Sequence, residues 1–127
     1  MASVPPPSPP SSQPTFGSAS KNKKSIYVPT LALDAEGTIQ YSNEPARRIL
    51  EYPSDASLDS CFFSHVHGHN LRRVMRDLAH MVRHGKPRAR WLLRLRTGNG
   101  RWRWYRAIAR NRLDDPDAIV QVRLRPL

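Results

Sequence analysis

Alternating apolar and polar residues between positions 91 and 106 predict a β-hairpin. Apolar side chains recur at every second position from Trp91 to Leu95, and a period of two is typical of a strand with one buried face. The run Gly98–Gly100 (Gly-Asn-Gly) suits a hairpin turn that needs positive φ angles. After the turn, Trp102 and Trp104 alternate with arginines. We therefore predict that all three tryptophans face the core and that the arginine row faces away.

A second hairpin and a short helix are predicted near the start of the patterned region. Residues 29–34 and 38–42 read as strands, and Asp34–Gly37 reads as the turn between them, with Gly37 supplying a positive φ. Asn43 is a typical N-cap for a helix whose first turn holds an acid and a proline. We expect that helix to end near Tyr52.

The remaining elements complete a mixed α+β pattern. Residues 70–84 predict the longest helix, ended by Gly85 and then a proline, with one apolar stripe made of Leu71, Val74, Met75, Leu78 and Val82. Strands are predicted at 88–97, 101–110 and 118–125. Because the late strands have no helix between them, we predict an antiparallel sheet with helices packed on one face.

Composition divides the chain into a tail and one domain. Residues 1–25 are rich in proline and serine, and they hold too few large apolar groups to offset the entropy of ordering. We interpret them as a disordered tail or linker, preferring this to a ligand for a proline-recognition module. Residues 26–127 form a single domain of ordinary size for one core.

Charge and cysteine content narrow the partners and the compartment. The net charge is +11, and the arginines gather from Arg88 onward, which implies acidic partners without choosing among them. Cys61 is the only cysteine, so an internal disulfide is excluded. No apolar run suits an export signal or a membrane span. These features favour a cytoplasmic location.

The order of these elements and their motifs resembles that of a PAS domain. The match covers about Pro29 to Arg125, and four segments carry the resemblance in order: the opening hairpin Asp34–Asn43, the helix Glu44–Tyr52, the segment Phe63–His67 and the hairpin Gly98–Trp104. Gly68, His69 and Asn70 replace the Pro-Asp-Asp that is usual in the family before the long helix. The resemblance implies a five-stranded antiparallel sheet with helices on one face.

The resemblance also implies a sensory or regulatory module of a signalling protein. Such a module binds a small ligand or pairs with another copy, and it relays to an effector such as a histidine kinase, a cyclic-dinucleotide enzyme or a transcription regulator. The chain stops soon after its last strand, so we expect a fragment whose effector is missing. We expect a weak homodimer through the outer sheet face or the N-terminal segment. The candidate pocket residues are Tyr41, Ile49, Phe63, Met75, Trp91 and Trp104; they either line a ligand cavity or fill the core, and residue types do not distinguish the two.

Catalytic and metal chemistry are disfavoured. His65, His67 and His69 alternate, but no carboxylate follows at ligand spacing, so we predict no metal site. His80 lies opposite the apolar stripe of its helix, which disfavours haem. Cys61 lacks the neighbours that a photoreactive flavin needs, and we interpret it as a buried cysteine. With no placed nucleophile and base, we predict that the domain is not an enzyme and leave any cofactor unnamed.

Two interpretations of the arginines remain. The candidate partner or anion surface is Arg94, Arg96, Arg101, Arg103, Arg123 and Arg125. A basic sheet face with exposed aromatic rings is how some modules hold single-stranded nucleic acid. Because we predict that Trp102 and Trp104 face the core, we expect a surface for an acidic partner or for a second copy, and we consider nucleic acid the weaker alternative.

Overall fold

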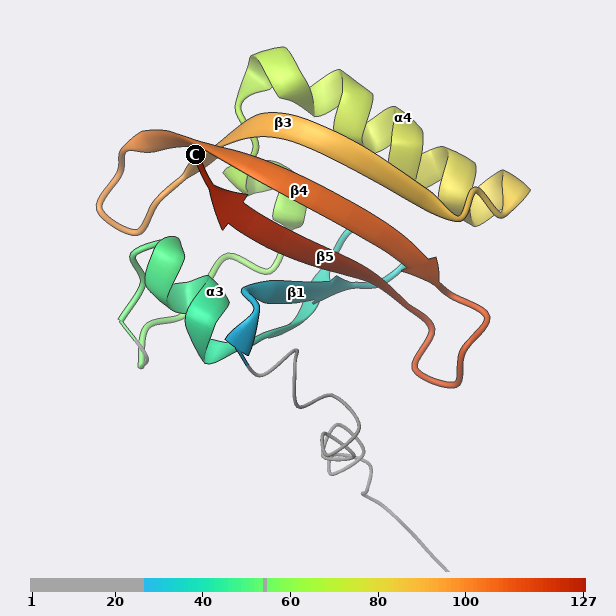
Figure 1. Ribbon diagram of the computed structural model, residues 1–127, viewed down its shortest axis with the longest axis horizontal. Coiled ribbons are helices and arrows are strands. Elements are labelled where there is room, and N and C mark those ends of the chain that lie inside the picture. The colour runs from blue at the N-terminus through green and yellow to red at the C-terminus, as the bar shows by residue number, and fades with distance from the viewer. Residues whose placement is uncertain (1–26, 54) are drawn as a thin grey trace, which may run out of the picture.

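The computed structural model describes residues 27–53 and 55–127, so the tail predicted over residues 1–25 lies outside the described residues. Within residues 27–53 and 55–127, five strands and three helical segments follow one another (Figure 1). In order they are β1 (Thr30–Leu33), β2 (Ile39–Ser42), α3 (Glu44–Ile49), the 3₁₀ turn η3 (Phe62–His65), α4 (Gly68–His84), β3 (Arg88–Arg96), β4 (Trp102–Arg112) and β5 (Ile119–Pro126).

The five strands form one antiparallel sheet in the order β2-β1-β5-β4-β3. The two chain-local hairpins are joined through β5, which inserts between β1 and β4. Helix α4 packs against β3, and α3 lies beside β1 (Figure 1). The predicted fold class, an α+β domain with a five-stranded antiparallel sheet, is confirmed.

Side-chain hydrogen bonds shape the first hairpin and its helix as the sequence predicts. The Asp34 carboxylate accepts the backbone N–H groups of Glu36 and Thr38, both at 2.9 Å, and Gly37 has a φ of 85°. The Asn43 side chain caps α3 by accepting the N–H of Ala46 at 3.0 Å. The same oxygen accepts the N–H of Thr30 in β1, so one amide anchors the helix to the sheet.

Helix α4 buries a different face from the predicted one. It begins at Gly68 and ends at Gly85, whose φ of 68° places it in the left-handed region that glycine tolerates. The buried residues are Val74, Asp77, Leu78 and Met81, whereas the predicted stripe members Met75 and Val82 are exposed. The buried side includes Asp77, whose carboxylate finds hydrogen-bond donors in the interior, and apolar periodicity does not register such a position.

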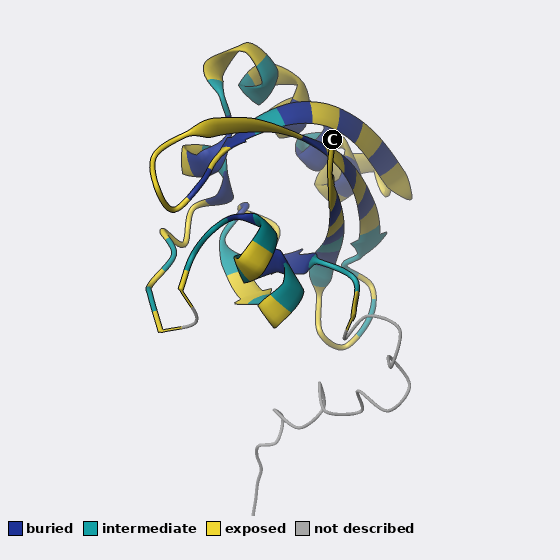
Figure 2. Cartoon of the chain, turned by 60° about the vertical axis from the view of Figure 1, so that its left-hand side comes forward, coloured by how far each residue is buried: buried dark blue, intermediate teal, exposed yellow. Residues whose placement is uncertain are grey.

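Buried residues alternate with more exposed ones over residues 88–96, 104–110 and 119–125 of the last three strands, visible as bands of different colour in Figure 2. The buried members of β3 and β4 that form the core are Ala89, Trp91, Leu93, Leu95, Tyr105, Ala107 and Ala109. Val120, Val122 and Leu124 of β5 join them beneath the helices. The sheet therefore has an inner face that carries the core and an outer face that meets solvent.

Candidate functional site

The inner face holds the aromatic side chains that any interior ligand would have to meet. Trp91 is 3% exposed and stacks on Phe62, with ring centroids 6.5 Å apart. Tyr105 is fully buried, and its hydroxyl donates a 2.8 Å hydrogen bond to the carbonyl oxygen of Ile49. Burial raises the pKa of the Tyr105 hydroxyl, against the opposing effect of the Arg103 charge, so the group stays protonated and remains a donor.

The six predicted pocket residues do not share one site. Trp91 is buried in the core, and Ile49 and Phe63 are partly buried against it. Tyr41, Met75 and Trp104 are 44%, 46% and 43% exposed. Those three side chains therefore do not lie between the helices and the sheet, and the prediction of a common interior location is wrong for them.

A buried carboxylate joins α4 to β3. One oxygen of Asp77 accepts the indole N–H of Trp91 at 2.9 Å, and the other accepts Lys86 Nζ at 3.0 Å. Burial alone raises the pKa of the Asp77 carboxyl, but the hydrogen bonds from Trp91 and Lys86 reverse the shift and hold it below the ordinary value. A second link between α4 and β3 lies near the N-terminus of the helix, where the Asn70 side chain accepts the backbone N–H of Arg94 at 2.9 Å.

The outer face of β3, β4 and β5 is dominated by arginine. Register pairs place Arg88 opposite Arg110, Arg94 opposite Trp104, and Arg106 opposite Arg125. We call this surface the arginine face and define it by the outward residues Arg88, Arg90, Leu92, Arg94, Arg96, Trp102, Trp104, Arg106, Ile108, Arg110, Gln121, Arg123 and Arg125. None of these positions holds an acid, so the surface presents eight arginines interleaved with four apolar side chains.

The tryptophans of β4 lie on this outer face, and the prediction that they face the core is wrong. Trp102 is 45% exposed, and Trp104 pairs with the outward Arg94. Every second residue of a strand shares a face, so turning these rings inward would also bury Arg106 and Arg110. Burying unpaired guanidinium groups is far more costly than exposing two indoles. Tyr105, Ala107 and Ala109 fill the inner face instead.

Arg101 and Arg103 do not belong to the arginine face, although they were predicted to. Arg103 Nη1 lies 2.8 Å and Arg101 Nη2 3.3 Å from the Glu51 carboxylate, at the end of α3. The hydrogen bond from Arg103 lowers the pKa of the Glu51 carboxyl, with a smaller contribution from the Arg101 charge and burial acting in the opposite direction. Glu51 adopts a φ of 64°, unusual outside glycine, to present this carboxylate. The two arginines therefore hold the hairpin turn against α3.

Sequence reasoning placed four members of the arginine face correctly and missed four others. Arg94, Arg96, Arg123 and Arg125 lie on the outer face as expected. Arg88, Arg90, Arg106 and Arg110 were not among the candidates. The signal was present, because each of them alternates with a small buried alanine: Ala89, Ala107 or Ala109.

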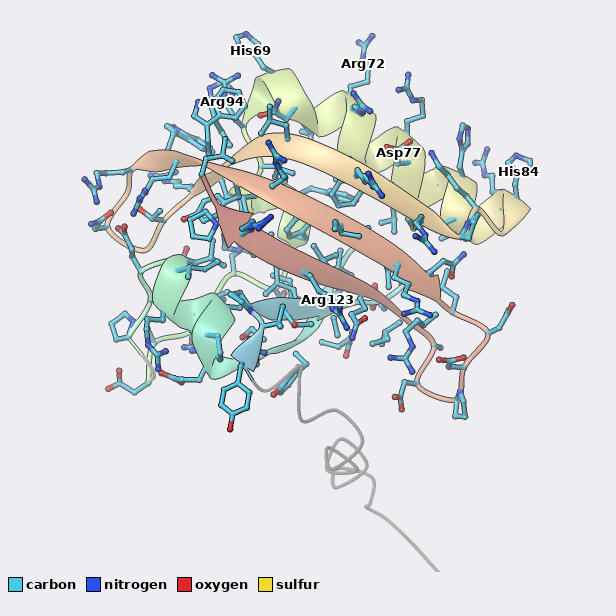
Figure 3. The ribbon with its side chains drawn as sticks, in the orientation of Figure 1. His69, Arg72, Asp77, His84, Arg94 and Arg123 are labelled. Atoms are coloured by element: carbon cyan, nitrogen blue, oxygen red, sulfur yellow. The ribbon has the colours of Figure 1, made fainter. Side chains whose placement is uncertain are left out.

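Three members of the arginine face surround a hollow of about 200 Å³. Its lining consists of Arg88, Ile108, Arg110, Gln121 and Arg123, from the three adjacent strands. Arg123 projects from β5 on the side of the sheet turned to the viewer in Figure 3, whereas Arg72 and His84 project from α4 away from the sheet. With three guanidinium groups beside Ile108 and Gln121, the hollow has the charge and the donors to receive an anion.

Aromatic and histidine side chains gather at the other end of the arginine face. Arg94 lies over the Trp104 ring, 4.7 Å from its centroid, and its Nη2 lies 3.2 Å from His69 Nδ1. The His67 ring meets the Trp102 ring edge-on at 4.9 Å and accepts the backbone N–H of His69, which caps α4. Burial lowers the pKa of His67, helped by the positive charges of Arg94 and His69.

The histidines, the cysteine and the helices of the described residues bear on metal binding and membrane spanning. Within residues 27–53 and 55–127, no three His, Cys, Asp or Glu side chains group closely enough to hold a metal ion. Cys61 is exposed, contrary to the expected buried cysteine. His80 and His84 pack edge to face at 5.7 Å on the exposed side of α4. None of the helices in this part of the chain is long and apolar enough to cross a membrane.

Comparison with known proteins places this geometry among PAS domains. Residues 24–125 match the sequence profile of the PAS fold. The structure is similar to the PAS domain of an HTR-like protein from Haloarcula marismortui, with a TM-score of 0.67, 13% identity and coverage of 91% of this chain and 97% of that one. No curated protein matches the sequence.

Two further structures are similar at the level of the fold. The PAS domain of a two-component sensor histidine kinase gives a TM-score of 0.65 at 18% identity, covering 91% of this chain and 99% of that one. The Drosophila melanogaster Cycle PAS-B domain, solved with bound ethylene glycol, gives a TM-score of 0.66 at 10% identity, covering 77% of this chain and 98% of that one.

Proposed function

The chain belongs to the PAS fold family, and from this premise we propose that it is the sensory or regulatory module of a signalling protein. In this role the domain binds a small ligand or a protein partner and biases the conformation of an attached effector. A histidine kinase, a cyclic-dinucleotide enzyme and a transcription regulator are the effector classes we propose, and the likeness to a sensor histidine kinase PAS domain supports the first.

The observation that carries this proposal is the placement of Trp91. Its ring lies in the interior against Phe62, and its indole N–H binds Asp77 on α4. Leu92 and Arg94, which alternate with Trp91 along β3, lie on the outer face of the sheet. Because alternate residues of one strand sit on opposite faces, a ligand that displaces Trp91 changes both the α4 contact and the outer surface. A ligand with unequal affinity for two such arrangements shifts their populations.

Native mass spectrometry and absorbance spectroscopy of the purified chain test the ligand part of the proposal. A mass in excess of the polypeptide, or an absorbance band beyond that of the aromatic residues, identifies a bound small molecule. Replacing Trp91 by Phe, which removes the indole N–H, is expected to weaken retention of that molecule. A chain that is free of ligand, and whose thermal midpoint does not respond to a library of small metabolites, contradicts a ligand-sensing role.

We propose that self-association through the arginine face is weak. In a dimer across this face, each copy would bring eight arginines and no acid against the same surface of its partner, so the charges repel. Salt screens that repulsion, with a Debye length of about 8 Å at physiological ionic strength. Sedimentation velocity across a sodium chloride series tests this directly: a dimer that strengthens with salt supports it, and a tight dimer at low salt contradicts it.

A further inference from the structure

The arginine face is costly for an isolated domain. Arg88 lies directly opposite Arg110, and Arg106 lies directly opposite Arg125. Like charges opposite each other across strands destabilise a sheet. The same surface exposes Trp102, Trp104, Leu92 and Ile108, each by 43% or more of its area. An anion that also offers apolar planar surface would relieve both penalties at once.

We propose that the arginine face binds single-stranded nucleic acid, with phosphates held by the guanidinium groups and bases stacked on the exposed tryptophans. This activity is separate from ligand sensing in the interior. Single-stranded nucleic acid supplies a regular row of anions together with unpaired rings, and proteins that bind it combine a basic groove with aromatic platforms. The sequence predicted that Trp102 and Trp104 face the core, but both rings are exposed on this face.

The hollow between Arg88, Arg110 and Arg123 is the seat for a phosphate. The guanidinium groups come from three neighbouring strands and surround Ile108 and Gln121. Arginine presents five N–H donors in a planar fork that matches phosphate oxygens in pairs. Gln121 adds an amide donor to the lining. No carboxylate stands at an outward position of these strands to compete for the donors.

The stacking platform lies along β4 from this seat. Trp104 is four residues before Ile108, which corresponds to about 13 Å along an extended strand. Arg94 packs over the Trp104 ring at 4.7 Å, so a guanidinium plane and an indole are presented together. Trp102 extends the platform by a further two residues and is supported edge-on by His67. A strand of a few nucleotides spans both parts.

Other occupants explain fewer of these features. A second copy brings the same positive charge. An acidic protein surface satisfies the arginines but has no general need for two exposed indoles beside them. The basic residues of α4, such as Arg72 and Arg83, are comparably exposed but have no tryptophan among them. Charge and rings coincide on the arginine face, and that coincidence favours nucleic acid.

Fluorescence anisotropy with a labelled single-stranded oligothymidylate of about 12 nucleotides tests the proposal. We expect binding that weakens as sodium chloride rises from about 50 to about 200 mM, because each neutralised phosphate contributes about −0.7 to the slope of log K against log salt. We also expect the single strand to compete better than a duplex of the same length, whose bases are already stacked. Polyglutamate of equal charge is expected to compete poorly.

Substitutions separate the two kinds of contact. Trp104→Ala removes a stacking surface from an exposed position, and we expect a loss of about 5- to 100-fold in affinity with the salt slope unchanged. Joint Arg110→Gln and Arg123→Gln changes remove two of the three guanidinium groups that hold one phosphate, and they are expected to reduce the slope by about 0.7. The matched control, Arg72→Gln with Arg83→Gln on α4, removes the same charge away from the face and is expected to leave the slope nearly unchanged.

Three outcomes overturn the proposal. Flat anisotropy at low salt removes nucleic acid altogether. Equal binding of duplex and single strand, with no effect of Trp104→Ala, reduces the interaction to unspecific attraction by charge. Polyglutamate that competes as well as the oligonucleotide, again with Trp104→Ala silent, assigns the face to an acidic protein. Circular dichroism of each variant confirms that the sheet is intact, so a loss of binding cannot be ascribed to unfolding.

Discussion

Replacing Asp77 with alanine is expected to destabilise the domain strongly, although aspartate on a helix surface normally contributes little. Asp77 is 6% exposed and receives the indole N–H of Trp91 at 2.9 Å and Lys86 Nζ at 3.0 Å. Without the carboxylate, the Trp91 N–H stays buried with no acceptor, which costs about 1–3 kcal/mol. The Lys86 ammonium is partly exposed and returns to water at little cost.

The two effects together give an expected loss of about 1–3 kcal/mol in the free energy of unfolding. For a domain of this size, each kcal/mol corresponds to about 4–8 °C in Tm, so we expect a fall of about 5–25 °C. Urea unfolding followed by tryptophan fluorescence, with thermal melts by circular dichroism, measures both quantities. Asp117→Ala makes the same chemical change at an exposed loop position and is expected to stay within about 0.5 kcal/mol of the parent.

A double-mutant cycle tests the assigned cause. Trp91→Phe keeps a ring in the core but removes the donor, so Asp77→Ala is expected to cost less in that background. If Asp77→Ala costs the same with Phe as with Trp at position 91, the hydrogen bond does not carry the effect. A stability within 0.5 kcal/mol of the parent for the single Asp77→Ala change would refute the reasoning altogether.

The pH dependence follows from the same carboxylate. Its pKa is lower in the folded protein than the ordinary value of 3.8, so the unfolded chain binds the proton more readily. The stabilisation is therefore complete above about pH 5 and is lost as the pH falls through the folded pKa. Asp77→Asn is expected to reduce the loss of stability below about pH 5, because asparagine retains an oxygen acceptor for Trp91 but has no titrating group. If the free energy of unfolding of that variant falls with pH as it does in the parent, the assignment to Asp77 is contradicted.

Three other local features lead to further predictions. Gly98→Ala is expected to destabilise the protein by more than about 1 kcal/mol, because the new Cβ would overlap the backbone oxygen of Glu51. The control Gly68→Ala places its Cβ in open space and is expected to be neutral. Thermal melts compare the two variants. Glu51→Gln is expected to remove part of the acid-side pH dependence of stability, since the folded pKa of Glu51 is lowered and its contribution disappears as pH falls; urea midpoints at pH 7 and 4 check this. The pKa of His67 is expected below 6.5, so protonation opposes folding as pH falls under that value; an NMR titration that places it above 6.5 contradicts the described surroundings.

Local chemistry in the sequence was sufficient for the elements and their turns. Asn43 predicts its own cap because the side chain is short enough to reach the N–H groups of the first helical turn. Asp34 and Gly37 predict their turn for similar reasons of reach and positive φ. The phase of β3 was also predicted, because Trp91, Leu93 and Leu95 alternate with arginines at both ends of the strand. The order of these elements was enough to predict an α+β fold with an antiparallel sheet, and the resemblance to PAS domains implied that the sheet has five strands.

The phase of β4 was not predictable from its large apolar residues. Trp102 and Trp104 lie on one face, and Tyr105, Ala107 and Ala109 lie on the other, so each half of the strand favours a different inner face. Small alanines carry a weak hydrophobic signal, although in a tightly packed core they leave room for larger neighbours. The arginines at 106 and 110 decide which face of β4 points inward, because in a continuous strand they lie on the same face as Trp102 and Trp104.

The sequence by itself therefore determined which segments become strands and helices, since caps, turns and periodicity act over a few residues. Only the tertiary structure decided which faces turn inward, because that choice depends on partners far along the chain. Asp77 is buried where Trp91 and Lys86 supply donors, and Arg103, which strand alternation places off the outer face, pairs with Glu51, 52 residues away. The exposed tryptophans follow from the same rule: burial is settled by the cost of a whole strand face and not by the hydrophobicity of single residues.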